Sequence, residues 1–150
     1  EGSESAVRSG IRRIGGLEVD PDEAAAYWMG LREPTQAYFA SRSPALPLWR
    51  IALPSTAPPL AAAALGFEDQ LIEWGGALRW IATSIGGDAI RAAATELGGH
   101  ATLWRGSDAM KAQYGVFTPL SSPLMAIHRR LKAEFDPDRL FNRVRSYSDW

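Results

Sequence analysis

Cysteine is absent from this 150-residue sequence and histidine is scarce, which excludes much reactive and metal-binding chemistry. Without cysteine there is no disulfide, thiolate zinc site, iron–sulfur cluster or cysteine nucleophile. The two histidines, His100 and His128, lie far apart in the sequence, and we therefore predict no metal site. Long apolar runs are missing as well. The most apolar stretch, Pro58 to Leu65, is far shorter than the roughly 20 residues that cross a membrane, so we predict no transmembrane segment.

Neither sign of charge predominates. The 16 basic residues nearly balance the 17 acidic ones, for a net charge of −1, so the chain lacks the basic field that favours nucleic acid. A hydrophobic fraction of 46% and a charged fraction of 22% are typical of an ordinary soluble domain, and the length suits about one domain.

The sequence begins without Met or a signal-peptide pattern, and it ends at Trp150 after an aromatic-rich stretch. We therefore expect the C-terminal portion of a longer polypeptide.

Helices are predicted on both sides of a central segment. The first covers Ser5 to Ile14 and ends at Gly15-Gly16. The second begins with Asp20 as N-cap and ends before Pro34. A final helix is expected from Ser121 through Phe135, because Asp136-Pro137 ends its pattern.

The central segment, residues 48–105, alternates strand and helix patterns. Period-two alternation predicts four strands, and two helical patterns lie between them: strands Leu48–Leu53, Gln70–Trp74, Leu78–Thr83 and Ala101–Arg105, and helices Pro58–Leu65 and Asp88–Leu97. The order strand, helix, strand, strand, helix, strand predicts an α+β fold of the ferredoxin-like split βαβ type. Its antiparallel sheet carries both helices on one face. Ser107 to Thr118 has no clear period and is expected to be a loop.

Strand alternation assigns side chains to the two faces of this sheet. The more apolar alternate residues are predicted to face the helices: Trp49, Ile51 and Leu53; Leu78, Trp80 and Ala82; Ala101 and Leu103. The open face then carries Arg50, Arg79, His100 and Trp104. Because the first and third strands are central neighbours in this fold, we expect Arg50 and Arg79 to form a clamp for a carboxylate or phosphate. The alternative, which is the more frequent outcome for charges on an exposed face, is that both arginines pair only with Glu73 or with water.

The last helix carries a histidine and many cations. His128 lies on an apolar stripe that is expected to be the buried face of the helix, formed by Leu124, Ile127, Leu131 and Phe135. We expect a structural histidine there rather than a catalytic base. A solvated helix face explains most of the basic cluster, and an anionic partner such as a cofactor pyrophosphate is the alternative; the cluster comprises Arg129, Arg130, Lys132, Arg139, Arg143 and Arg145.

Several segments resemble a known class of flavoenzymes. The run Ile127–Pro137, followed by Leu140-Phe141-Asn142, is similar to the C-terminal signature of FAD-linked oxidases of the vanillyl-alcohol-oxidase type. More narrowly, Leu48–Pro54 and Glu73–Trp80 resemble the FAD-binding subunits of glycolate oxidases, and the helix with Tyr27-Trp28 strengthens this similarity.

The resemblance implies that residues 1–150 are the C-terminal cap, or substrate, domain of a flavoprotein whose N-terminal FAD-binding domain is absent. Residues 48–105 would be its ferredoxin-like core, and residues 121–150 its C-terminal helix and returning tail. The full-length protein would use FAD to oxidise a small 2-hydroxy acid such as glycolate, whereas this fragment alone is expected to be inactive and not to retain FAD. The implied partners are the missing FAD domain and sister subunits of a multisubunit complex. The implied location is the cytoplasm, or the inner membrane face through those subunits.

Individual roles come from two sources. Asn142 and Arg145 match the family motif, which implies contact with the FAD edge or the domain junction, although Arg143 and Val144 replace the Pro and Gly of the family's turn. Face geometry alone nominates the other site residues, with His100 as candidate proton acceptor and Arg50, Arg79 and Trp104 as substrate contacts.

A competing hypothesis is non-catalytic. The chain would then be a subunit-docking module whose open sheet binds the sister chain. Trp104 and the surrounding arginines suit this hypothesis, because Trp and Arg are enriched at interface hot spots.

Overall fold

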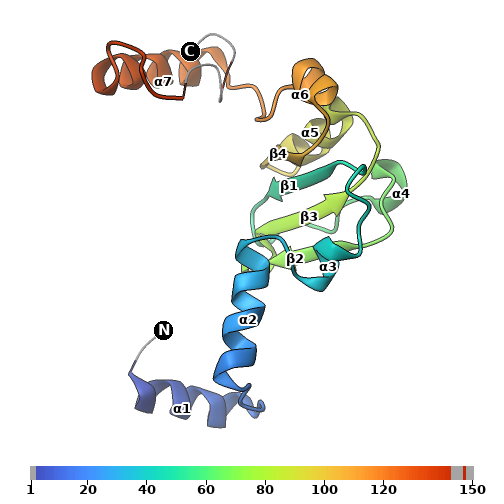
Figure 1. Ribbon diagram of the computed structural model, residues 1–150, viewed down its shortest axis with the longest axis vertical. Helices are drawn as coiled ribbons and strands as arrows, with labels where there is room; N and C mark the ends of the chain where they lie inside the picture. The colour runs from blue at the N-terminus through green and yellow to red at the C-terminus, as the bar shows by residue number, and fades with distance from the viewer. Residues whose placement is uncertain (1–2, 143–146, 148–150) are drawn as a thin grey trace. The chain divides into compact units, whose positions relative to one another are not determined.

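The N-terminal helices have the boundaries that their capping residues predict. The computed structural model describes residues 3–142 and 147, and it divides into a helical unit, Glu1–Arg42, and a sheet unit, Ser43–Trp150 (Figure 1). The helical unit contains α1 (Glu4–Ile14), α2 (Pro21–Arg32) and α3 (Ala37–Ala40). Gly15 ends α1 with a left-handed φ of 73°. The Asp20 carboxylate caps α2 by accepting the backbone N–H of Asp22 at 2.9 Å and of Glu23 at 3.2 Å.

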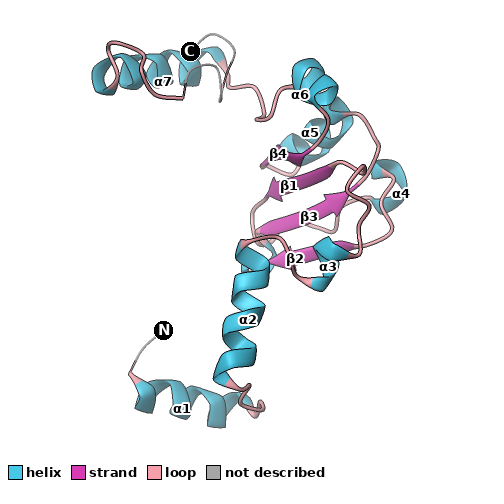
Figure 2. Ribbon diagram, viewed as in Figure 1, coloured by secondary structure: helices cyan, strands magenta, loops and turns pink. Residues whose placement is uncertain are grey.

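The sheet unit has the predicted topology. Its elements follow one another as β1 (Leu48–Ala52), α4 (Ala62–Leu65), β2 (Gln70–Glu73), the 3-10 turn η1 (Trp74–Gly76), β3 (Leu78–Ala82), α5 (Gly87–Glu96) and β4 (His100–Arg105). The strands form one antiparallel sheet in the order β2-β3-β1-β4 (Figure 2). This arrangement confirms the α+β, ferredoxin-like fold.

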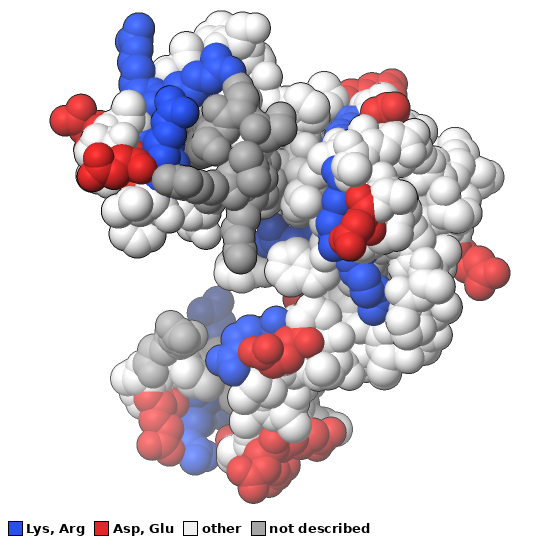
Figure 3. Space-filling view, turned by 45° about the horizontal axis from the view of Figure 1, so that its top comes forward, with Lys and Arg blue, Asp and Glu red and all other residues white. Residues whose placement is uncertain are grey.

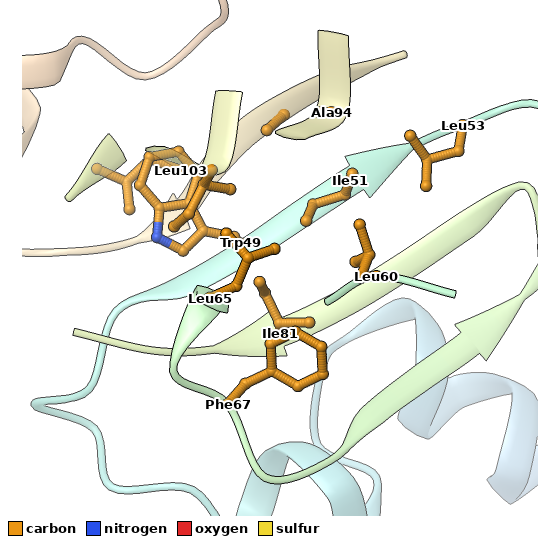
Figure 4. Close-up of a cluster of buried hydrophobic side chains, with 11 residues drawn as sticks. Trp49, Ile51, Leu53, Leu60, Leu65, Phe67, Ile81, Ala94 and Leu103 are labelled. Atoms are coloured by element: carbon orange, nitrogen blue, oxygen red, sulfur yellow. The ribbon is translucent and has the colours of Figure 1, made fainter. Parts of the chain in front are cut away.

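The core lies between the sheet and α4 and α5. Trp49 and Ile51 of β1 are 0% exposed and pack in one cluster with Leu65 of α4 and with Ile90 and Ala94 of α5 (Figure 4). Burying a side chain of this size contributes about 1.5–3 kcal/mol to folding. The predicted helix-facing residues of β1 and β4 are therefore confirmed: Trp49, Ile51, Leu53, Ala101 and Leu103 all belong to this cluster.

The predicted facing of β3 is wrong. Ile51 pairs with Arg79, and Trp49 pairs with Ile81. Directly opposed residues of an antiparallel pair share a face, so Arg79 lies on the helix side and Trp80 on the other side. All five residues of β3 are buried. A strand buried on both faces has no alternation of polarity, and this is why the pattern gave the wrong face.

The segment after β4 contains a helix where a loop was expected. Helix α6 (Asp108–Tyr114) begins after Ser107, whose hydroxyl accepts the backbone N–H of Met110 at 3.2 Å. The chain then follows the free edge of β4, where the N–H of Leu103 donates to the carbonyl of Val116 at 2.8 Å. This contact satisfies part of an edge that would otherwise be open to other strands.

The final helix, α7 (Ser122–Phe135), matches its predicted extent, but its apolar stripe is not buried. Leu124, Ile127 and Leu131 are each about half exposed, and Phe135 is 81% exposed. The periodicity correctly identifies an apolar face, but it does not say whether the partner of that face lies in this chain. His128, on the same stripe, is only partly buried.

Two further observations concern surface character. Among the described residues, no helix combines the length and apolar composition that crossing a membrane requires. On the face shown in Figure 3, basic and acidic side chains lie interspersed, in keeping with the nearly balanced charge.

Candidate functional site

The sheet face opposite α4 and α5, here the distal face, carries the candidate site. Arg50 pairs directly with Trp80 of β3 and with Thr102 of β4, so these three side chains share that face. His100 and Trp104 alternate with Thr102 and lie there as well. This face is open only in part: His100 and Trp104 are exposed, whereas Leu48, Leu78, Trp80 and Ala82 on the same face are buried.

Two tryptophans form the centre of the distal face. The rings of Trp80 and Trp104 meet edge to face, with centroids 5.2 Å apart and an interplanar angle of 89°. They come from β3 and β4, which are separated by β1, so the two rings meet across the strand that carries Arg50. Trp80 is 4% exposed and Trp104 is 50% exposed. The face therefore offers one fixed aromatic ring and one that is accessible.

Arg50 is a cation of this face that the described residues leave available. Its guanidinium carbon lies 6.0 Å from the centre of the Trp80 ring, at the limit of a cation–π contact. Arg50 is half-buried, and within the described part of the chain no carboxylate pairs with it and no acceptor takes its N–H groups. A partly desolvated guanidinium of this kind is suited to bind a carboxylate or phosphate from outside the chain.

Glu73 holds the fixed tryptophan. The indole N–H of Trp80 donates to the Glu73 carboxylate, with 2.5 Å between Nε1 and Oε2. Sequence reasoning considered Glu73 only as a partner for the arginines, and it placed Trp80 on the wrong face. The two residues are diagonal neighbours in the register that joins Glu73 to Leu78, which is a relation that the correct facing of β3 would have revealed.

Arg79 does not join Arg50, so the predicted two-arginine clamp is not formed. Its side chain is 4% exposed on the helix side of the sheet. The guanidinium donates to the carbonyls of Pro58 and Ala57, both at 2.7 Å, and more weakly to that of Gly76 at 3.3 Å. Arg79 thus ties the loop after β1 to the turn between β2 and β3.

The other predicted site residues have mixed outcomes. Trp104 and His100 lie on the distal face as expected, and His100 pairs with Ala52 at the end of β1. Asn142 has a left-handed φ of 48°, which asparagine tolerates better than most residues and which suits a tight turn. Arg145 lies outside the described residues.

A buried carboxylate that the sequence reasoning missed organises the C-terminal turn. Asp136 is 6% exposed and accepts the backbone N–H of Leu140 at 2.8 Å and of Phe141 at 3.1 Å. Lys132, one turn earlier on α7, forms an ion pair with Asp136 and donates to the carbonyl of Phe141 at 2.6 Å. A lysine four residues before an aspartate that ends the helix is the signal from which this turn was predictable.

The charge on Asp136 is expected to hold this turn. The hydrogen bond from Lys132 lowers the pKa of Asp136, and the N–H groups of Leu140 and Phe141 lower it further, against the opposing effect of burial. Because the folded pKa lies below the unfolded one, the stabilisation is present above the ordinary carboxyl pKa and is lost as pH falls through the lowered pKa. We expect the amide resonances of Leu140 and Phe141 to follow this acid titration in NMR spectra.

Substitution separates this role from a general effect of charge. Asp136→Asn is expected to remove the protection of the Phe141 amide from hydrogen exchange at neutral pH. Asp138→Asn, which removes an exposed carboxylate from the same segment, is expected to leave that amide unchanged. An equally protected Phe141 amide in Asp136→Asn would contradict the assignment.

The chain is similar to a protein of known name. No family model matches it, and no solved structure matches it. It is 39% identical over 151 residues to glycolate oxidase subunit GlcE of Escherichia coli (strain K12). The similarity covers 99% of this chain but 38% of GlcE, so the chain spans little more than a third of that relative's length. Over nearly its entire length, then, this chain is a relative of the corresponding stretch of GlcE, which confirms the resemblance to a glycolate oxidase subunit.

Proposed function

We propose that this chain is the cap-domain part of a flavin-dependent subunit of the glycolate oxidase type, which covers the FAD ring and helps to form the pocket for a small 2-hydroxy acid. The similarity to GlcE supports the type of enzyme. The observation that carries the pocket is Arg50, a half-buried guanidinium without an ion pair to any described residue, beside two tryptophans. The residues 121–150 are proposed to return toward the missing FAD domain.

The distal face suits contact with the flat ring of a flavin rather than binding of the phosphates of FAD. The half-exposed Trp104 offers an aromatic surface to a flat ring. The sequence has no glycine-rich phosphate loop, so the pyrophosphate of FAD would be held mainly outside this chain. Asn142 and Arg145 are proposed to touch the FAD edge or the domain junction. When bound by the complete protein, FAD supplies the acceptor for a hydride.

In this proposal the chain's own residues orient the substrate. Arg50 binds the carboxylate of the 2-hydroxy acid and fixes which carbon faces the ring. Trp80 and Trp104 exclude water from one side. His100, on the same face as Arg50, takes the proton of the substrate hydroxyl. The complete protein acts with sister subunits in the cytoplasm or, through them, at the inner membrane face.

Arg50 provides the test. NMR titration of the chain with glycolate at constant ionic strength is expected to shift the indole N–H resonances of Trp80 and Trp104. Arg50→Gln is expected to weaken the apparent affinity at least about tenfold, because a charged hydrogen bond contributes about 1.5–3 kcal/mol. Arg130→Gln, which removes an exposed arginine of α7, is the matched control and is expected to have no effect. Glycolate shifts that are absent, or equal in both variants, would refute the proposed pocket.

The exposed apolar surface favours a second candidate, the non-catalytic docking module. Trp104 is half exposed and the apolar stripe of α7 is uncovered in this chain. If the distal face docks the sister chain, Trp104→Ala is expected to weaken subunit assembly at least about tenfold, as hot-spot truncations do. Glycolate would then not shift the resonances of the distal face.

A further inference from the structure

We infer that Glu73 is a positioning residue, which acts through Trp80 to set the place and the affinity of Arg50 for a small carboxylate. This inference rests on the proposed function, since it assumes that Arg50 is the carboxylate contact. It adds a residue to which neither the sequence motifs nor the similarity to GlcE gave a role.

The register places the three side chains in a line across three strands. Glu73 on β2 and Trp80 on β3 are diagonal neighbours on the distal face, and Trp80 pairs directly with Arg50 on β1. Contacts follow the same line. The carboxylate of Glu73 accepts the indole N–H of Trp80 at 2.5 Å, and the guanidinium of Arg50 lies 6.0 Å from the centre of the Trp80 ring.

The hydrogen bond has two effects on Arg50. First, it fixes the rotation of the indole, whose ring forms one side of the space that the guanidinium occupies. Second, donating its N–H to an anion leaves the indole ring richer in electrons, which strengthens its attraction for a cation. Glu73 itself is engaged by the indole and forms no ion pair with Arg50, so the guanidinium keeps its capacity for an external carboxylate.

A positioning role and a simple charge effect of Glu73 predict opposite changes in glycolate affinity when Glu73 is replaced with alanine. If Glu73 acted only through its charge, removing it would relieve repulsion of an anionic ligand, and both Glu73→Ala and Glu73→Gln would bind glycolate more tightly. If Glu73 positions Trp80, Glu73→Ala weakens binding by about two- to fivefold, the fold-change that corresponds to one cation–π contact. Glu73→Gln keeps an acceptor that fixes the indole but not the anion that enriches its ring, so it is expected to bind glycolate more tightly than Glu73→Ala does.

The experiment is the same glycolate titration by NMR, with the indole N–H resonance of Trp80 as an independent readout. In Glu73→Ala without ligand, this resonance is expected to move and to exchange faster with water, and Glu73→Gln restores it in part. Trp80→Phe retains an aromatic ring but removes the N–H, and it is expected to weaken glycolate binding while Glu73 is still present. Glu68→Ala, which removes an exposed glutamate near β2, is the matched control and is expected to change neither readout.

The outcomes separate this inference from the proposed function. Glycolate affinity that is unchanged or higher in Glu73→Ala, with Arg50→Gln weakened as expected, would overturn the positioning role alone. Affinity that is insensitive to Arg50→Gln, or absent in the unmodified chain, would overturn the proposed carboxylate site together with this inference. Weakening in Glu73→Ala and Trp80→Phe, with recovery in Glu73→Gln, is the result we expect.

Discussion

Replacing Gly99 with alanine is expected to destabilise the sheet unit more than the same substitution at the other described glycines. Gly99 directly precedes β4, where the chain passes very close to the end of β1. A Cβ atom at this position would lie 2.0 Å from the carbonyl oxygen of Ala52 and 2.6 Å from a methyl carbon of Leu53. The first of these contacts is with backbone, so no rotation of a side chain relieves it.

The clash would disturb the pairing of the central strand β1 with the edge strand β4. Ala52 pairs with His100, so moving its carbonyl displaces the first rung of the β1–β4 ladder. We expect a loss of about 3 kcal/mol or more, a large part of the 5–15 kcal/mol by which a typical domain is stable. Urea denaturation followed by circular dichroism measures this as a lower midpoint.

Gly98 offers a matched control one residue away. It has a φ of 76°, but its Cβ would meet nothing closer than a carbon of Pro54 at 3.7 Å. Gly98→Ala therefore incurs only the cost of a left-handed conformation, about 1–2 kcal/mol. Equal midpoints for the two variants would show that the close approach of Gly99 to β1 has no energetic importance.

The success of the sequence patterns depended on how local the signal was. The boundaries of α2 and of the strands follow from caps, prolines and period-two alternation, which act within a few residues. The order of the strands followed from the alternation of elements along the chain, because few folds accommodate that order. The predicted helix Pro58–Leu65 was too long, since α4 covers only Ala62–Leu65. The short α6 escaped prediction, since a single capping serine before seven helical residues is a weak signal.

The site was less predictable because it depends on non-local register. Arg50 was placed correctly, since β1 alternates between buried and half-buried residues at its centre. Arg79 and Trp80 were exchanged between faces because β3 is buried throughout, and only the pairing of Ile51 with Arg79 reveals which side each takes. For α7, the amphipathic pattern was real, but its apolar stripe stays about half exposed or more among the described residues. A helical period does not reveal what covers such a stripe.

Because Arg79 lies on the helix side of the sheet, its substitution is expected to lower the stability of the chain rather than its affinity for a ligand. Had Arg79 been a substrate contact, Arg79→Met would weaken ligand binding and leave stability unaltered. In the structure its guanidinium satisfies carbonyls of Ala57, Pro58 and Gly76 beside the core. Methionine supplies no donor, and a hydrogen bond from a charged group contributes about 1.5–3 kcal/mol, so losing the two bonds of 2.7 Å is expected to lower the free energy of unfolding by about 3 kcal/mol or more.

Lysine tests the geometry of this contact rather than its charge. A single ammonium group does not reproduce the planar fork with which arginine reaches several carbonyls at once, so Arg79→Lys is expected to recover only part of the loss. Arg50→Gln, which loses at most one cation–π contact on the distal face, is the control and is expected to change stability by no more than about 1 kcal/mol. The urea midpoints of the three variants measure these differences. If Arg79→Met were as stable as Arg50→Gln, the guanidinium of Arg79 would not be holding the loop after β1. The assignment of Arg79 to a structural role rather than to ligand binding would then fail.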